Sequence, residues 1–371
     1  ARRMNVGRGV ISVLVGELIA DGLIYEGATG EAARGRKPTF LHIRTQDRII
    51  VAVDLRFSRT SLLLTDFGGR QLDLEVFETV FAPTQFVAYL AERVHQLLVK
   101  HDAVARCEGV GISVPGIVDH RTGRVLNAPA LGWRNVDLRD EFAARTGLTV
   151  QVENAAKACA VAQMWHGRSD PVGGQNFAFI NISDGVGVGL VVNGELVRGR
   201  GNMAGEFGHN PLSLDGPRCM CGASGCWEAY ISNIATLSRF CGRDLSKIGS
   251  KALMEAGSQT AGELTVEDLI ELADGGEARA LAAIQTTGRY LGLGLAGVIN
   301  ALNPARVYLS GEITGAWHLI ETTVRMALSE RALTSGAAET KLLIEPHADH
   351  PRLRGAAALV AAPTFAAPRV A

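Results

Sequence analysis

Hydrophobic residues at helical spacing open the chain. Two series with a four-residue repeat predict one helix with an apolar stripe: Val10, Leu14 and Leu18, and beside them Ile11, Val15 and Ile19. Gly22 follows Asp21 and ends this helix, because glycine readily takes the left-handed turn after a helix. Two short strands are expected next, at 23–26 and 39–43, with a glycine-rich loop at 27–35 between them. This order is typical of the second half of a winged helix-turn-helix.

From Ile49 onward the apolar residues run continuously instead of alternating with polar ones. Such runs are typical of strands that are buried on both faces of a sheet. The pattern predicts a first α/β unit with strands at 49–54, 58–66, 71–77 and 108–114, and a helix at 83–101.

A second unit repeats the strand-turn-strand opening of the first. Its elements are a strand at 149–153, a helix at 155–167 and a strand at 176–183 that leads into the glycine-rich turn and strand of 184–189. The repetition indicates an internal duplication. A helix at 277–302, strands at 306–309 and 341–345, and a final alanine-rich helix complete the unit.

Composition limits the classes of partner and compartment. The net charge is −1, so any contact with nucleic acid needs a local basic patch. Hydrophobic residues make up 47% and charged residues 20%, as in a globular protein with large cores. We find no pattern typical of a signal peptide and no uninterrupted apolar run of about 18 residues, so we expect neither a leader nor a membrane span. Six cysteines in 371 residues suggest a reducing compartment, so we expect a cytoplasmic protein without membrane contact.

The N-terminal segment carries a modest basic surplus. Residues 1–37 hold six basic against four acidic side chains. We expect DNA contacts from two helical residues and from three residues of the loop: Arg8, Ser12, Arg34, Arg36 and Lys37. A solvated hairpin explains the same surplus. A whole winged helix also needs one or two earlier helices, and we expect these to be missing from this sequence.

Three cysteines and a histidine give the clearest chemical signal. They have C-x-C-x4-C spacing, with the histidine ten positions earlier: His209, Cys219, Cys221 and Cys226. Three thiolates and an imidazole complete a tetrahedral zinc site with no position left for water, which predicts one structural zinc per chain. Gly222 and Gly225 let the backbone turn tightly enough for the ligands to converge. A chance cluster of small buried cysteines, or disulfides, is the alternative.

These motifs resemble the signature of the ROK family (repressors, open reading frames and sugar kinases). The similarity rests on the segments 206–209 and 219–228 and extends in the family's order through Pro115–Asp119, Leu131–Val136, Glu153-Asn154 and Asn300–Pro304. It implies an α/β, two-lobed actin-like or hexokinase-like ATPase fold, with duplicated ribonuclease-H-like lobes after a partial winged helix-turn-helix. We therefore expect three parts: 1–45, the winged helix-turn-helix; 46–152 plus 351–371, the first lobe; and 153–350, the second lobe with the zinc knot.

Three departures from the family's kinases argue against catalysis. The resemblance places nucleotide phosphates at two turns, but the turn at 54–60 carries bulky residues and the turn at 183–185 carries Asp184, which would repel a triphosphate. The family's catalytic base is an aspartate where this chain has Ala155. Losing a general base costs about 10²–10⁴ in rate. We expect no enzymatic activity.

The same resemblance implies a sugar site. Four of the family's five sugar-contacting positions keep a polar residue: Asn154, Glu206, His209 and Glu228. The fifth is Ala155, and the asparagine usual before Leu131 is Ala130. Each missing group weakens a sugar by roughly 1–3 kcal/mol if its hydroxyl stays unpaired. We therefore expect a pocket that is enlarged for a different or substituted sugar, or one that has lost its ligand response. A purely structural role for Glu206 and Glu228, as partners of the zinc ligand, is the alternative.

Taken together, these features predict a sugar-responsive transcriptional repressor of carbohydrate genes. It would bind operator DNA as a homodimer or homotetramer, and a sugar or sugar derivative would change the angle between its lobes. A degenerate sugar kinase is one alternative. A regulatory member that does not bind DNA and works through protein partners is the other.

Overall fold

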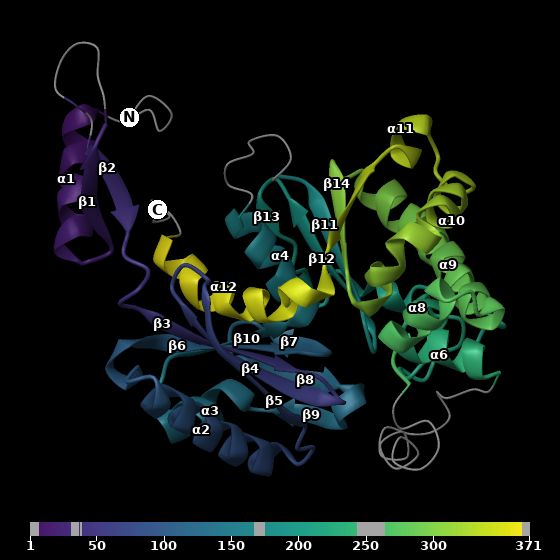
Figure 1. The fold of residues 1–371 in the computed structure, drawn as a ribbon, viewed down its shortest axis with the longest axis horizontal. Coiled ribbons are helices and arrows are strands. Elements are labelled where there is room, and N and C mark those ends of the chain that lie inside the picture. Colours follow the sequence, from purple (N-terminus) through teal and green to yellow (C-terminus); the bar gives the residue numbers. More distant parts are fainter. Residues whose placement is uncertain (1–6, 31–36, 38, 167–174, 243–263, 366–371) are drawn as a thin grey trace.

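Two α/β lobes face each other, and a small N-terminal unit stands beside them (Figure 1). The structure is a computed structural model and describes residues 7–30, 37, 39–166, 175–242 and 264–365. Among these residues, no helix is both long and apolar enough to cross a membrane.

The N-terminal unit is a helix followed by a two-stranded antiparallel sheet, as the sequence predicts. It comprises α1 (Arg8–Ala20), β1 (Ile24–Thr29) and β2 (Thr39–Ile43). β1 runs three residues further than predicted and takes in part of the expected loop. The apolar stripe of α1 does not pack into a core of the described residues, since Val10 is 52% and Leu14 41% exposed.

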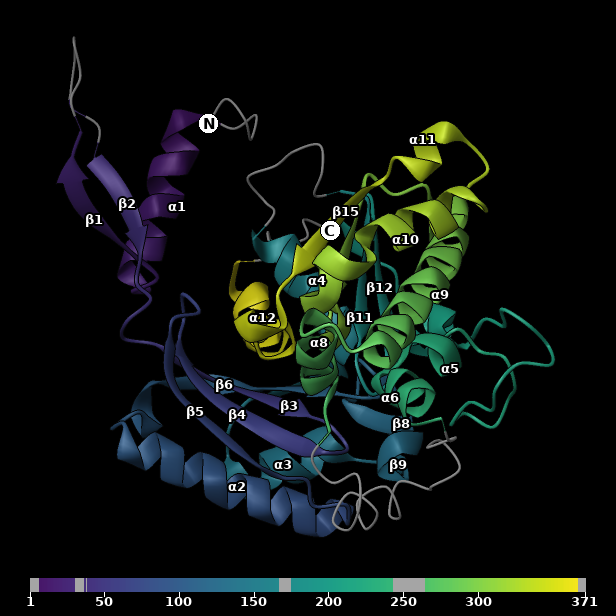
Figure 2. The same cartoon turned by 45° about the vertical axis from the view of Figure 1, so that its right-hand side comes forward.

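The first lobe is built on a five-stranded sheet in the order β10-β6-β3-β4-β5. Its strands are β3 (Ile49–Leu55), β4 (Arg59–Asp66), β5 (Gln71–Glu78), β6 (Cys107–Val114) and β10 (Val150–Asn154). Alternate residues of β3 face opposite layers. Val51 and Val53 pack with Phe86 and Leu90 of α2 (Pro83–Lys100). Ile50 and Ala52 pack under α12 (Pro351–Phe365). Figure 2 shows α2 and α3 (Leu138–Thr146) on the face of the sheet opposite α12.

The second lobe repeats the first lobe's topology. Its sheet has the order β13-β12-β11-β14-β15, with β11–β12 and β12–β13 antiparallel and β11–β14 and β14–β15 parallel. Read from its edge, the first sheet has the same sequence of pairings, β5-β4-β3-β6-β10. The strands are β11 (Phe177–Ile182), β12 (Val186–Val192), β13 (Glu195–Leu196), β14 (Arg306–Ser310) and β15 (Lys341–Glu345). The duplicated, actin-like two-lobe fold predicted from the sequence is therefore confirmed.

Helices cover both faces of the second sheet. α4 (Ala155–His166) packs on one face through Cys159 and Ala160, against Phe177 and Phe179. The other helices are α5 (Glu228–Ile231), α6 (Asn233–Cys241), α8 (Val266–Asp274), α9 (Ala278–Leu302), α10 (Trp317–Ser329) and α11 (Ser335–Ala338). Residues of α8, α9 and α10 share the large core on the opposite face.

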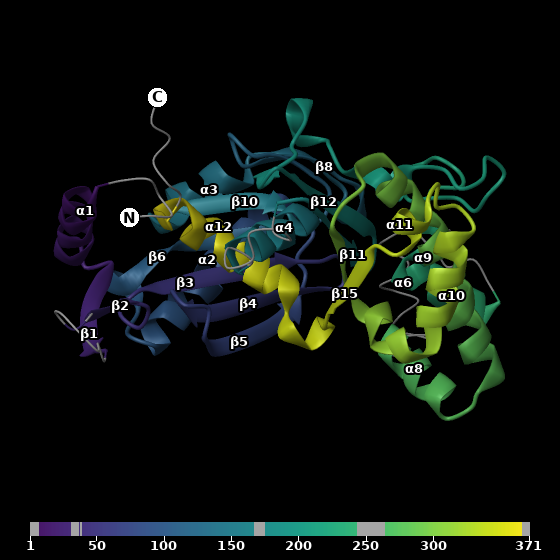
Figure 3. The ribbon, with the colours of Figure 1, turned by 90° about the horizontal axis from the view of Figure 1, so that it is seen from above.

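Helix α12 joins the two lobes, as Figure 3 shows where it runs beside α4. The approach is close because both helices and the sheet present small residues. A Cβ on Gly355 would lie 2.7 Å from the Ala158 carbonyl carbon, and one on Gly111 would lie 1.9 Å from the Ala356 oxygen.

A small three-stranded sheet was not predicted from the sequence. It consists of β7 (Ile117–Asp119), β8 (Arg124–Ala128) and β9 (Trp133–Val136), inserted between β6 and α3. Trp133 fixes it to the lobe, since its Nε1 donates to the Phe81 carbonyl at 2.6 Å and its ring contacts Phe86. The insertion places Pro129 and Ala130 beside the cleft between the lobes.

Candidate functional site

The predicted metal ligands converge in one cluster. The ligand atoms of His209, Cys219, Cys221 and Cys226 all lie within 4.8 Å of one another. Cys221 Sγ lies 3.7 Å from Cys226 Sγ, and Cys219 Sγ lies 3.7 Å from His209 Nδ1. Two thiolates on a tetrahedral zinc with Zn–S bonds of about 2.3 Å are about 3.8 Å apart. All six cysteines are free, and the three of the cluster, with the histidine, could hold a metal ion.

Glycines shape the loop that carries the cysteines. Gly222 has φ 99° and Gly225 has φ 74°, a region that residues with a Cβ rarely adopt. A Cβ on Gly225 would lie 1.5 Å from the Ser213 carbonyl oxygen. Burial, followed by the charge of Glu228, raises the pKa of the Cys219 thiol above its ordinary value. A bound cation would offset that cost, because it favours the thiolate.

A second tight turn presents His209 and Glu206. The turn is η6 (Glu206–His209), and it packs against β12 because its glycines leave room for that strand. A Cβ on Gly205 would lie 2.2 Å from the Val188 oxygen, and one on Gly208 would lie 2.3 Å from the Val186 oxygen. His209 therefore has two faces. Its Nδ1 meets the cysteines, and its Nε2 lies 4.0 Å from Glu206 Oε2.

A cavity of about 140 Å³ lies between the lobes, next to the cluster. It is lined by all four residues predicted to contact a sugar, Asn154, Glu206, His209 and Glu228. Ala155 and Ala130, where the chain departs from the kinase pattern, also line it. The four predicted sugar-contacting residues and the two altered positions therefore lie around one cavity, and their role in binding a sugar stays a prediction.

The polar groups of the cavity differ in how much hydrogen-bonding capacity they have left for a ligand. Asn154 caps α4: its Oδ1 accepts from Ala156 N at 3.0 Å, and its Nδ2 donates to the Gly116 oxygen at 2.9 Å. One N–H of that amide remains for a ligand. Glu228 Oε2 accepts from Val186 N at 2.9 Å, and its Oε1 lies 3.3 Å from Cys219 Sγ.

Glu206 is the carboxylate with most freedom to accept from a ligand. Its side chain is 35% exposed, and the one ion-pairing contact of its carboxylate among the described residues is His209 Nε2, at 4.0 Å. Burial raises the pKa of Glu206, and the charges of Lys157 and His209 oppose that effect. Lys157 is 2% exposed, and its Nζ donates to the Asn202 carbonyl in the segment that leads to Glu206.

The two turns that would hold nucleotide phosphates are joined by an ion pair. Arg56, in the first turn, donates from Nη2 to Ser183 Oγ at 2.5 Å, and its Nε lies 3.4 Å from Asp184 Oδ2. Nη2 also donates to Glu312 Oε1 at 2.5 Å. From the sequence alone, Arg56 is only one of the bulky residues in this turn. The missed signal was a set of carboxylates after the strands of the opposite lobe, at Asp184 and Glu312.

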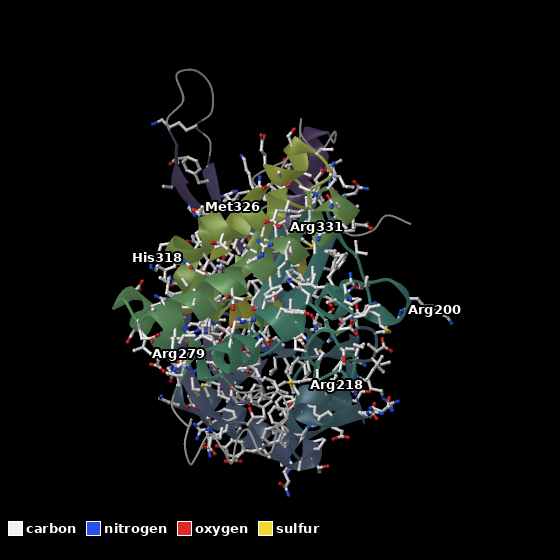
Figure 4. All side chains as sticks on the ribbon, turned by 90° about the vertical axis from the view of Figure 1, so that its right-hand side faces the viewer. Arg200, Arg218, Arg279, His318, Met326 and Arg331 are labelled. Carbon is white, nitrogen blue, oxygen red and sulfur yellow. The ribbon has the colours of Figure 1, made fainter. Side chains whose placement is uncertain are left out.

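A larger cavity of about 510 Å³ adjoins the first and shares Asp184, Met220 and Glu228 with it. Arg218, labelled in Figure 4, lines this cavity, whereas Arg200 extends outward from the molecule. The most buried cation of this larger cavity is Arg239. It is already hydrogen-bonded within the protein, since it donates to the Tyr230 oxygen at 2.6 Å and to Thr287 Oγ1 at 2.7 Å. The smaller cavity therefore has the better-placed groups for a polyol.

The predicted DNA-contacting residues are only partly placed. Ser12 is exposed on α1, and Lys37 is exposed near β2. Arg8 begins α1, but its side chain lies outside the description, as do Arg34 and Arg36 altogether. Arg8 and Ser12 are four residues apart and share one face of α1.

Comparison with known proteins identifies the family. A model of the ROK family matches residues 50–362. The chain belongs to the ROK family. The xylose repressor of Bacillus subtilis is 27% identical over 329 residues, which span 88% of this chain and 80% of that protein.

Two solved ROK structures resemble the fold closely. A ROK family transcriptional regulator, a homolog of the Escherichia coli MLC protein, has a TM-score of 0.77 at 27% identity and covers 97% of this chain and 90% of its own. A ROK family glucokinase from Streptomyces griseus, in complex with glucose and AMPPNP, has a TM-score of 0.72 at 27% identity and covers 84% of this chain and 98% of its own. This ROK protein is thus similar to both regulators and kinases.

Proposed function

We propose that this ROK protein is a sugar-responsive DNA-binding repressor of carbohydrate genes. The observation that carries the proposal is the cavity where Glu206, His209 and Glu228 meet beside a complete metal ligand set while Ala155 replaces the base. Relatives named xylose repressor and MLC homolog support the regulatory role. A sugar or sugar derivative would bind between the lobes and alter their angle.

The proposed zinc is structural, with one ion per chain. Three thiolates and an imidazole leave it no open coordination position, so it would orient residues rather than activate water. Through Nδ1 it would fix the ring of His209 and leave Nε2 to donate toward the cavity. Glu206 and Glu228 would then accept hydrogen bonds from sugar hydroxyls, and Asn154 would donate one. The zinc cluster would form one wall of the sugar site.

We further propose that the protein does not phosphorylate its sugar. No carboxylate stands at position 155, and the phosphate turns hold Arg56 and Asp184 against each other. A triphosphate would have to break that ion pair and displace a buried guanidinium. A degenerate kinase is the alternative, and the similarity to the Streptomyces griseus glucokinase is the reason to test it.

Restoring the base alone is expected to leave the protein without kinase activity. Ala155→Asp returns a carboxylate to the cavity wall, but nucleotide phosphates still face the Arg56–Asp184 ion pair. A coupled assay of sugar-dependent ADP release, over a panel of hexoses and pentoses, should give background rates for the wild type and for Ala155→Asp. ADP release that scales with the amount of either protein would establish the kinase alternative.

The proposed DNA-binding part is the N-terminal unit, with the helix α1 in the major groove. The match to the ROK family model begins only at residue 50, after α1, β1 and β2. Arg8 and Ser12 on α1, and Arg34, Arg36 and Lys37 between the strands, are the proposed contacts. A homodimer or homotetramer would present two such units to two half-sites, so the lobe angle would set their spacing.

Binding to the DNA upstream of its own coding sequence is the test of this assignment. In fluorescence anisotropy we expect the chain, with all its native N-terminal residues, to bind that DNA. The affinity should fall steeply with salt, because phosphate contacts release counterions. A scrambled DNA of equal length is the control. Absence of binding at low salt would favour the member that acts through protein partners.

A further inference from the structure

The base of the Arg56 side chain is fixed in the first lobe. Arg56 follows β3 and is 5% exposed. Its backbone N–H donates to the Arg59 oxygen at 3.1 Å, and its carbonyl accepts from Thr79 Oγ1 at 2.7 Å. Next to it, Arg352 Nε pairs with Asp54 Oδ1 at 2.8 Å. The guanidinium therefore projects from a rigid support.

The partners of that guanidinium belong to the second lobe. Ser183 and Asp184 follow β11, and Glu312 follows β14, so one side chain bonds to two separate segments there. These segments are the loops after adjacent parallel strands of the second sheet. A change in the angle between the lobes would pull Arg56 away from them.

Arg56 and its carboxylate partners stabilise each other's charged forms. Burial by itself would lower the pKa of Arg56, but Asp184, Glu312 and Asp54 raise it above the ordinary value. Burial would raise the pKa of Glu312, but Arg56 and His347 bring it down to about 2. Both partners thus stay ionised at neutral pH. Glu312 also belongs to a group with Glu267 and His347 that has metal-ligand spacing, but Arg56 already neutralises its charge.

The contact is continuous with the proposed sugar cavity. Arg56 and Asp184 line that cavity together with Glu206 and Glu228. Glu228 accepts a hydrogen bond from Val186 N, two residues beyond Asp184. A ligand that draws on Glu228 therefore acts on the same turn that Arg56 holds.

We propose that Arg56 is an inter-lobe clasp that takes the place of a nucleotide. Its ion pairs hold the two lobes closed around the cavity without help from a bound nucleotide. The lobes separate when these ion pairs break. The biological role of this clasp rests on the proposed function, because closure of the cleft has a role only if a sugar binds between the lobes. The clasp itself is a property of the ligand-free chain, so its test needs neither sugar nor DNA.

The test compares two charge-removing double variants by small-angle X-ray scattering of the ligand-free protein. Arg56→Met/Glu312→Gln removes the clasp without leaving its most buried charge unpaired. Arg48→Met/Glu108→Gln is the matched control, since that pair bonds at 2.6 and 2.7 Å but lies within the first lobe. We expect a larger radius of gyration for the first variant and the wild-type value for the second.

Two outcomes overturn the proposal. One is a wild-type scattering curve for Arg56→Met/Glu312→Gln, and the other is equal expansion of both double variants. If the clasp variant does not fold, Arg56→Lys carries the test, because lysine keeps the positive charge but lacks the planar fork that joins two segments. It should expand the molecule in the same direction. Failure of sugar or DNA binding would contradict the proposed function and leave these scattering results intact.

Discussion

Cys221→Ser is expected to lose most of the bound zinc and to lower the melting temperature by roughly 10 °C. The reason is the position of Cys221 in the cluster. Cys221 is an exposed residue, so serine costs little in packing, and a fall in stability reports the lost ligand. Loss of a structural metal is among the few single changes that cost about 4 kcal/mol or more. In a lobe of this size, each kcal/mol shifts the melting temperature by about 2–4 °C.

Metal analysis and differential scanning calorimetry on the same samples check this expectation. The wild type should hold about one zinc per chain. Cys241→Ser is the control, because Cys241 is half-buried in α6 and takes no part in the cluster. It should keep both the zinc and the melting temperature. A wild-type protein purified without chelators that folds normally and contains no metal would contradict the zinc assignment.

Glu206→Gln is expected to weaken sugar binding by roughly 10- to 100-fold. Glu206 is the cavity carboxylate that the described chain leaves most open, whereas Glu228 is already bonded to the Val186 amide. A hydrogen bond to a charged group contributes about 1.5–3 kcal/mol, and each 1.4 kcal/mol is tenfold in affinity. The amide keeps the shape of the side chain, so stability without ligand should hardly change.

A thermal-shift screen with mono- and disaccharides first finds the sugar. At about 100 times its dissociation constant, a sugar stabilises the wild type by roughly 2.7 kcal/mol. Titration calorimetry then compares Glu206→Gln with Glu195→Gln, a change at an exposed position on β13. If Glu206→Gln binds the sugar with wild-type affinity, Glu206 has a structural role beside His209 and does not contact the sugar. A screen in which no sugar stabilises the wild type would mean that the cavity has lost its ligand.

The fold could be predicted largely because its strands are long and apolar on both faces. β3 and β11 read as nearly continuous hydrophobic runs, and the repeated strand-turn-strand pattern revealed the duplication. The metal cluster was equally accessible, since its ligands fall within one short stretch from His209 to Cys226. In both cases the decisive interactions are encoded locally.

Long-range partners could not be predicted in the same way. The strands of the β7–β9 sheet are three to five residues long and carry charged residues such as Asp119 and Arg124, so they lack a hydrophobic pattern. Arg56 meets Ser183 and Glu312, which are 127 and 256 positions away. A turn that looked merely unfit for phosphate thus proved to hold an ion pair between the lobes. The exposed apolar stripe on α1 is a similar case, because periodicity predicts a helix but does not predict what packs against its apolar face.

We expect a sugar in the cavity next to the metal cluster to control DNA binding. The most direct measurement is fluorescence anisotropy of the protein on its own upstream DNA, titrated with the sugar found in the screen. The sugar should release wild-type protein from the DNA, and Glu206→Gln should need roughly 10- to 100-fold more sugar for the same release. A DNA complex whose affinity is unchanged by a sugar that binds the same protein would contradict control of DNA binding by this cavity.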